Sequence, residues 1–205
     1  MRASSLRIAA SDYSAQPWRL HEIAPREFRV EDVWRIPGTG TAAEFDQLID
    51  RLCTFDPSTS SSVILRALFG ARERLGELFG WDDGLWEPHR TLIDRVPEDL
   101  RSSSGLNLSP LPFRQLYRTP AEWAAEAANQ TMHGILHLGR VPEGEDRYAA
   151  HLTVLVKPNG LLGQAYMAFI KPFRYLLVYP RLLGTELAWP GAAAAPGPAQ
   201  RAARP

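Results

Sequence analysis

The chain has 205 residues, of which 45% are hydrophobic and 22% are charged, a composition typical of one globular domain with a substantial core. Lysine plus arginine and aspartate plus glutamate number 23 each, so the zero net charge gives no reason to expect nucleic-acid binding. Cys53 is the only cysteine, which excludes an internal disulfide and a thiolate zinc cluster and suits a reducing compartment.

The first 36 residues divide into a tail and a strand region. Residues 1–11 carry Arg7 and several serines where a secretory signal needs a continuous apolar run, so we expect a short tail on a cytoplasmic protein. Residues 18–36 are rich in aromatic and branched side chains, with a break at Pro25. This pattern predicts two short extended pieces at the edge of a sheet.

Two helices are predicted next. Thr41 and Glu44 stand three residues apart, as the partners of a capping box do, and apolar residues recur at helical spacing after them. We therefore predict a helix over residues 41–53. A second apolar series at helical spacing begins at Val63 and stops before Gly80, which predicts another helix against the same core.

The middle of the chain changes from irregular to extended. Residues 82–111 contain prolines, acidic residues and a serine-rich stretch, so we expect an irregular excursion or lid with one helical turn near residues 90–96. The pattern then becomes extended in three segments, which are residues 113–117, 132–141 and 148–156. The loop between the last two suits a hairpin, so these strands should be antiparallel neighbours.

Residues 119–128 give two conflicting local signals. Thr119, Pro120 and Glu122 make a good helix start before an alanine-rich stretch, so propensity alone predicts a helix. However, Asn129-Gln130 suits a two-residue turn into the next extended segment. We favour a strand for part of this segment.

Residues 161–183 predict a long amphipathic helix. Its apolar face consists of Leu162, Tyr166, Phe169, Phe173, Leu176 and Leu177. Its other face carries Gln164, Lys171, Arg174 and Arg181, and these polar residues also argue against a membrane span. Pro172 and Pro180 should bend the helix, which would keep it against a curved sheet. Residues 189–205 form an alanine- and proline-rich tail that we expect to be disordered, so the predicted domain is residues 12–188.

Several motifs in the second half of the chain are familiar. They include Glu122-Trp123-Ala124-Ala125-Glu126, Asn129-Gln130-Thr131-Met132-His133-Gly134, His137-Leu138-Gly139, Val156-Lys157-Pro158-Asn159-Gly160 and Lys171-Pro172-Phe173-Arg174. With these motifs the chain resembles the bacterial family known as domain of unknown function 2867. That family is similar to the START/Bet v 1-like helix-grip superfamily. The resemblance implies an α+β fold in which a curved antiparallel sheet wraps around a long C-terminal helix and an apolar pocket, with two shorter helices after the first strand region. It also favours a strand at Glu122.

One polar constellation stands out on the predicted sheet. Its members are Glu122, Glu126, His133, His137 and His151. A two-residue turn between the first two strands places His133 opposite Glu126 on one face. The same register places His137 opposite Glu122, and a hairpin after the second strand places His151 opposite His137. A carboxylate that orients an imidazole suits general base catalysis, and two histidines with a carboxylate suit a metal.

A simpler interpretation is that this histidine face is the solvated back of the sheet. The opposite face carries the apolar residues expected of a core, which are Trp123, Met132, Leu136, Leu138, Leu152, Val154 and Val156. Charge pairs across exposed strands are common and contribute little. The sequence also lacks a Gly-rich phosphate loop, a Gly-x-Ser-x-Gly elbow and a His-Glu-x-x-His element, so nucleotide, serine and zinc hydrolysis have no support.

Three functions stay open from the sequence. The leading hypothesis is a protein without a cofactor or metal that binds an apolar or aromatic small molecule between sheet and terminal helix. Its predicted ligand contacts are Trp34, Tyr117, Tyr166, Phe169, Phe173, Lys171 and Arg174. The second is an enzyme of the cyclase, aromatase or dehydratase kind, in which His137 or His133 is the base. The third is an interaction module or homodimer that uses the Lys171 and Arg174 face.

Overall fold

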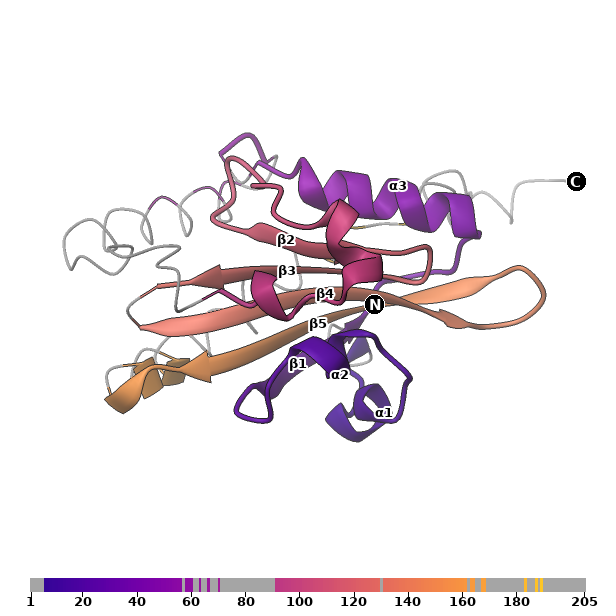
Figure 1. Cartoon of the computed structure of the whole chain (residues 1–205). Helices are drawn as coiled ribbons and strands as arrows, with labels where there is room; N and C mark the ends of the chain where they lie inside the picture. The colour runs from indigo at the N-terminus through magenta and orange to yellow at the C-terminus, as the bar shows by residue number, and fades with distance from the viewer. Residues whose placement is uncertain are drawn as a thin grey trace, which may run out of the picture.

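The computed structural model describes residues 6–56, 58–60, 91–129 and 131–161, together with residues 63, 66, 70, 163, 164, 167, 168, 183, 187 and 189. This described part is an α+β fold built on one five-stranded antiparallel sheet (Figure 1). Its strands are β1 (Arg29–Arg35), β2 (Arg114–Arg118), β3 (Glu122–Ala128), β4 (Met132–Pro142) and β5 (Tyr148–Pro158). The last four form a meander, and β1 pairs with β5, so the order is β1-β5-β4-β3-β2.

Helix α3 (Ala42–Cys53) confirms the capping box that the sequence predicts. The Glu44 amide donates to Thr41 Oγ1 at 3.3 Å, and the Thr41 amide donates to Glu44 Oε2 at 2.8 Å. Both otherwise unpaired amides of the first turn are therefore satisfied. The apolar face of the helix, from Phe45 to Leu52, is buried against the sheet.

The prediction of two extended pieces before the first loop is half right. β1 is the expected edge strand, but the segment before it contains two short helices, α1 (Ala10–Ser14) and α2 (Leu20–Ile23). Leu20 and Ile23 stand three residues apart and are both buried, which a helical turn allows and an extended strand does not. Ala24, which precedes Pro25, has an extended backbone and ends α2.

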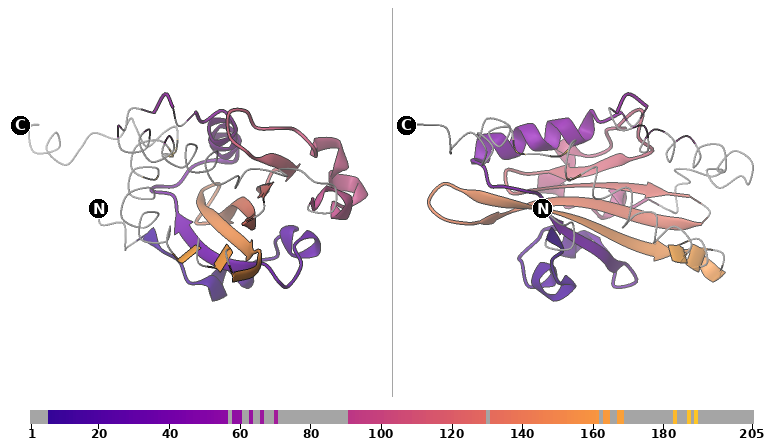
Figure 2. Two further views of the ribbon diagram at one scale, coloured as in Figure 1. Left: turned by 90° about the vertical axis from the view of Figure 1, so that its left-hand side faces the viewer. Right: turned by 180° about the vertical axis from the view of Figure 1, so that it is seen from behind.

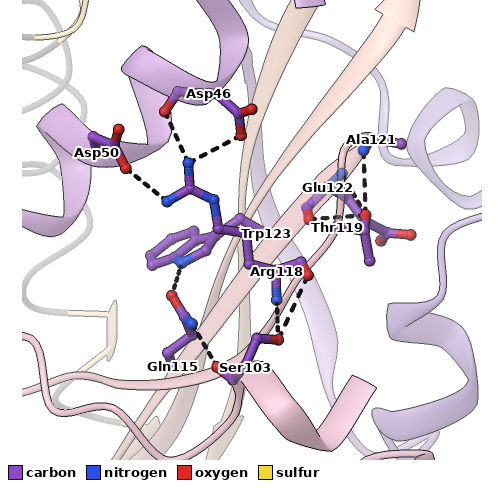
Figure 3. A network of polar contacts seen from close by, with 9 residues as sticks. All are labelled: Asp46, Asp50, Ser103, Gln115, Arg118, Thr119, Ala121, Glu122 and Trp123. Carbon is purple, nitrogen blue, oxygen red and sulfur yellow. Dashed lines mark hydrogen bonds and ion pairs between the residues drawn. The ribbon is translucent and has the colours of Figure 1, made fainter. Parts of the chain in front are cut away.

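Residues 119–128 form a turn and a strand, which confirms the strand interpretation against alanine's helix propensity. Thr119 Oγ1 accepts hydrogen bonds from the Ala121 and Glu122 amides, and the Thr119 amide donates to the Glu122 carbonyl (Figure 3). The Thr119 hydroxyl, which could have capped a helix, therefore closes a tight turn here. All seven residues of β3 are buried, and small alanine side chains allow both faces of this strand to be covered closely.

Both faces of the sheet are covered. One face packs against α3, and its core includes Trp34, Ile36, Phe45, Leu48, Ile49, Trp123, Leu138 and Leu152. The other face packs under α1, α2 and the 3₁₀ helices η3 (Ile93–Arg95) and η4 (Glu98–Ser103), and its core includes Tyr13, Trp18, Leu20, Phe28, Leu92, Leu116, Tyr117 and Ile135. Figure 2 shows α3 well separated from α1 and α2, with the sheet between them. The interpretation of the histidine face as a solvated back is therefore wrong.

Polar side chains fasten the edge strand β2 to α3 (Figure 3). Arg118 donates to Asp50 Oδ1 at 2.6 Å and to Asp46 Oδ1 at 2.9 Å. Trp123 Nε1 on β3 donates to Gln115 Oε1 on β2 at 2.8 Å. These contacts hold the β2–β3 ribbon in place, and so position the glutamates that β3 carries on its other face.

Several predicted features lie partly outside the described residues. Val63, Arg66 and Gly70 are helical, and the rest of the predicted second helix is not described. Described positions between residues 160 and 168 are helical, whereas most of the predicted C-terminal helix is not described. Trp189, where the predicted tail begins, is buried beside Phe45 with ring centroids 6.3 Å apart. None of the helices in the described ranges has the length and apolar character that a membrane crossing demands.

Candidate functional site

The β3–β4 hairpin carries two histidine–glutamate pairs on its second face. His133 Nε2 lies 2.7 Å from Glu126 Oε2, and His137 Nε2 lies 2.9 Å from Glu122 Oε2. The sequence predicts both partnerships and the shared face, and the structure confirms them. All four side chains are at least nine-tenths buried, so each pair lies in the covered interior rather than on the surface.

The strand register differs from the predicted one by two residues. Glu122 pairs with Gly139 rather than with His137, so each glutamate reaches its histidine diagonally. The cause is a longer turn, in which Asn129 Oδ1 accepts from the Thr131 amide, the Thr131 hydroxyl and the Met132 amide. A shift of two residues keeps every side chain on its face, whereas a shift of one would have removed the constellation.

His151 lies on the same face but is not the direct neighbour of His137. Its partner on β4 is Gly139 and its partner on β1 is Arg35, while His137 pairs with Thr153. The predicted straight row of Glu122, His137 and His151 is therefore wrong by the same two-residue shift. Among the described residues, no three histidine, cysteine or acidic side chains are arranged to hold a metal ion.

Each buried carboxylate accepts hydrogen bonds from the same three kinds of donor. Glu122 accepts from His137, from the Tyr117 hydroxyl at 2.8 Å and from the Arg19 backbone amide at 2.8 Å. Tyr117, a predicted ligand contact, thus belongs to this hydrogen-bond network. An imidazole, a hydroxyl and an amide together hold Glu122 in place.

Glu126, four residues further along β3, has the same arrangement. It accepts from His133, from the Thr91 hydroxyl at 2.5 Å and from the Leu92 amide, which lies 2.9 Å from Oε2 and 3.2 Å from Oε1. Both amides come from segments that cross over the sheet. The glutamates therefore fasten these covering segments to the face that carries the histidines.

The Glu122–His137 pair is an ionised carboxylate beside a neutral imidazole. Burial raises the pKa of Glu122, but the hydrogen bonds from His137, the Arg19 amide and Tyr117 together lower it below its usual value. Burial lowers the pKa of His137, and the hydrogen bond to Glu122 only partly opposes this. Nε2–H of His137 therefore donates to Glu122, and Nδ1 holds the lone pair.

Aromatic side chains seal the His137 pair. The ring of Trp18 lies 5.0 Å from the imidazole and that of Tyr13 lies 5.5 Å from it, both edge-on. A Cβ atom at Gly139 would lie 2.6 Å from the Trp18 ring, so glycine at this position makes room for the indole. Burial, together with the charge of Glu122, raises the pKa of Tyr13, which keeps its hydroxyl neutral. His137 is fully buried as a result.

The His133 pair borders a pocket of about 330 Å³. The pocket is lined by Pro25, Glu27, Phe28, Thr91, Leu92, Arg95, His133, Lys157 and Asn159. Phe28 packs edge-on against the imidazole at 4.9 Å, and Lys157 is the direct cross-strand partner of His133. Because Nε2 faces Glu126, Nδ1 is the ring nitrogen left for a ligand, and it bonds no described residue.

Trp34 is the one remaining predicted ligand contact within the described residues, and it does not line this pocket. Trp34 is buried in the core on the α3 side of the sheet, away from the histidines. Tyr166, Phe169, Lys171, Phe173 and Arg174 lie outside the described residues. Sequence reasoning missed Thr91, Leu92 and Arg19, since two of these act through backbone amides, which every residue except proline carries. The predicted lid at residues 82–111 does supply two of them, and η3 lies within its predicted helical turn.

The free energy of unfolding is expected to fall as the pH is lowered. Burial, followed by the charge of Arg35, lowers the pKa of His151 from 6.5 to about 4. Between these values the unfolded chain binds a proton that the folded chain does not, so acid favours unfolding, by about 1–3 kcal/mol for this partly buried group. His137 acts in the same direction, and Glu122, with its lowered pKa, adds a loss at pH values below about 4.5.

Urea denaturation at a series of pH values measures this dependence. The variant His151→Gln should flatten the slope between about pH 6.5 and pH 4 while leaving the steeper loss at lower pH. The exposed His21 provides the control for the substitution itself, because His21→Gln also replaces a histidine by glutamine but leaves the surroundings of His151 unchanged. A slope that His151→Gln leaves unchanged would contradict the assignment.

Comparisons with known proteins place the chain in one family. A family model described as "Protein of unknown function (DUF2867)" matches residues 24–181, which is more than half of the chain. The match confirms the family resemblance predicted from the sequence motifs. No curated protein and no solved structure matches the chain. The likeness to the START/Bet v 1-like superfamily stays a prediction.

Proposed function

We propose that this chain, which belongs to the DUF2867 family, binds a small molecule in the pocket over His133 and removes a proton from it. His133 is the proton acceptor, and Glu126 is the residue that orients it. The observation that carries the proposal is the 2.7 Å contact between Glu126 Oε2 and His133 Nε2 at the wall of a pocket. A carboxylate–imidazole pair open to a ligand is an arrangement suited to general base catalysis.

The hydrogen bonds of Glu126 select the tautomer that proton removal needs. Its oxygens already accept from Thr91 and Leu92, so the carboxylate also accepts from His133 Nε2–H. The lone pair of the ring then lies on Nδ1. A proton leaves the bound molecule for Nδ1, and the nearby carboxylate stabilises the imidazolium that forms.

The two histidines differ in solvent access, and this difference favours His133 as the reactive one. His133 is 8% exposed and borders the pocket, while His137 is 0% exposed beneath Tyr13 and Trp18. A base must come within hydrogen-bond reach of the proton that it takes. In this proposal the His137 pair has a structural role.

A carrier function is the second candidate. In it, an apolar or aromatic molecule lies between the sheet and the C-terminal helix in a helix-grip fold of a cytoplasmic protein. The antiparallel meander and the helical positions between residues 160 and 168 support this architecture. The single free Cys53 suits the cytoplasm.

The test uses nitrobenzisoxazole, a neutral one-substrate probe whose ring opens when a base removes its carbon-bound proton. The wild-type protein should open it faster than an equal concentration of free imidazole, and His133→Gln should lose about 100-fold or more of the rate. The exposed histidine variant His21→Gln is the matched control and should keep the rate. A His133→Gln protein with the wild-type rate would contradict the proposal, and a bound small molecule without proton transfer, seen by native mass spectrometry, would favour the carrier.

A further inference from the structure

Two cationic side chains and one carboxylate line the pocket. Lys157 Nζ lies 2.7 Å from Glu27 Oε1, and Arg95 lines the pocket from η3. Lys157 is also the direct cross-strand neighbour of His133, so a group bound to its ammonium would lie beside the proposed base. The pocket thus holds a cation on the strand side and another on the covering side.

We propose that the pocket receives a small organic acid whose carboxylate takes the place of the Glu27 carboxylate beside Lys157 and Arg95. This inference rests on the proposed function, because it names the substrate class of the same pocket. Glu27 is then an internal competitor, which holds the cationic position until the ligand replaces it.

The environment of Glu27 shows that this position favours an anionic oxygen. The hydrogen bond from Lys157, the charge of Lys157 and the charge of Arg95 lower the pKa of Glu27. A ligand carboxylate at the same position would meet the same two cations. It would also be free to adjust its geometry to both, since the protein backbone does not constrain it.

The contact between Glu27 and Lys157 is weak enough to exchange. The two side chains are 54% and 41% exposed, and ion pairs with this exposure contribute little to stability. Glu27 stands in the short connection between α2 and β1, which also carries Phe28. A ligand therefore displaces a surface ion pair and leaves the core intact.

The other walls of the pocket limit the size of the acid and favour an apolar group next to its carboxylate. Pro25, Phe28 and Leu92 supply apolar surface, and the volume of about 330 Å³ is at the small end of ligand pockets. A single ring or short apolar chain fits these walls. With its carboxylate at Lys157, such a molecule brings its neighbouring C–H or O–H group toward His133 Nδ1.

Benzoate and its neutral isostere benzamide test the inference by NMR titration of the full-length protein. Benzoate should bind about tenfold more tightly than benzamide and should shift the signals of His133, Thr91 and Lys157.

Two variants test the cationic position. In Lys157→Met, benzoate and benzamide should bind with about equal affinity, and Glu27→Gln should strengthen benzoate binding about threefold or more. Arg26→Met is the matched control, because it removes a positive charge from the same connection without changing the pocket lining.

The outcomes separate this inference from the proposed function. Equal affinity for benzoate and benzamide, absence of benzoate binding, or a preference that survives Lys157→Met would overturn the inference. Benzoate should slow the His133-dependent ring opening of nitrobenzisoxazole by the wild-type protein, and Arg26→Met should keep both the rate and this inhibition. If benzoate is preferred but no His133-dependent proton transfer occurs, the proposed function is contradicted and the inference of an acid stands. If proton transfer occurs without that preference, the inference of an acid is contradicted and the proposed function stands.

Discussion

Glu126→Gln is expected to lower the rate of proton removal in the pocket by about 100–1000-fold without unfolding the protein. The Leu92 amide donates toward both oxygens of Glu126, and it lies closer to Oε2 than to Oε1. A glutamine must place its NH₂ group at one of these positions. At Oε2 the group would face His133 Nε2 and the Leu92 amide, and at Oε1 it would leave only a neutral amide oxygen beside His133, so either orientation removes the negative charge that stabilises the imidazolium.

Where the NH₂ group lies beside His133, it also changes the tautomer of the histidine. An NH₂ donor beside His133 Nε2 requires a lone pair on that nitrogen, which moves the ring proton to Nδ1. In that orientation Nδ1 of the proposed base has no lone pair to accept a proton. Nitrogen-15 chemical shifts of the ring measure the tautomer, and nitrobenzisoxazole opening measures the rate.

Two variants make this experiment decisive. Glu98→Gln changes an exposed glutamate on η4 in the same way and should leave both tautomer and rate unchanged. Thr91→Val removes the hydroxyl donor to Glu126 but keeps the carboxylate, so it should lower the rate about tenfold or less. A Glu126→Gln protein that keeps the wild-type tautomer and the wild-type rate would refute the orienting role of Glu126.

Glu122→Ala is expected to lower the free energy of unfolding by about 3–5 kcal/mol, the largest stability loss that we predict. The change leaves three donors without their acceptor, namely the buried His137 Nε2–H and Tyr117 hydroxyl and the partly buried Arg19 amide. Unpaired buried polar groups each contribute a desolvation penalty. The aromatic cover over His137 hinders water from replacing the carboxylate.

Urea denaturation monitored by tryptophan fluorescence measures this loss. Glu122→Gln should cost less than Glu122→Ala, because the amide keeps one oxygen for the Arg19 amide and fills the same volume. Glu22→Ala removes an exposed glutamate on α2 and should change the stability by about 0.5 kcal/mol or less. A loss for Glu122→Ala no larger than that for Glu22→Ala would show that the network around Glu122 does not hold the fold together.

Local sequence signals determine much of the scaffold. The capping box and the apolar spacing after it are contained within a dozen residues, so α3 forms as predicted. The alternation of side chains along β3 and β4 also determines which residues share a face. That alternation is why both histidine–glutamate pairs are correct although the register differs by two residues.

Only the tertiary structure decides that the histidine face of the sheet is buried and which of its two histidine–glutamate pairs borders a pocket. The amides that bind the two glutamates come from Arg19 and Leu92, which lie 103 and 34 residues before their partners in the chain. Backbone amides carry no sequence signature, and no local pattern records that Trp18 covers His137 while a pocket borders His133. Periodicity and caps act within one element and can be read from the sequence, whereas burial and solvent access depend on how distant segments pack.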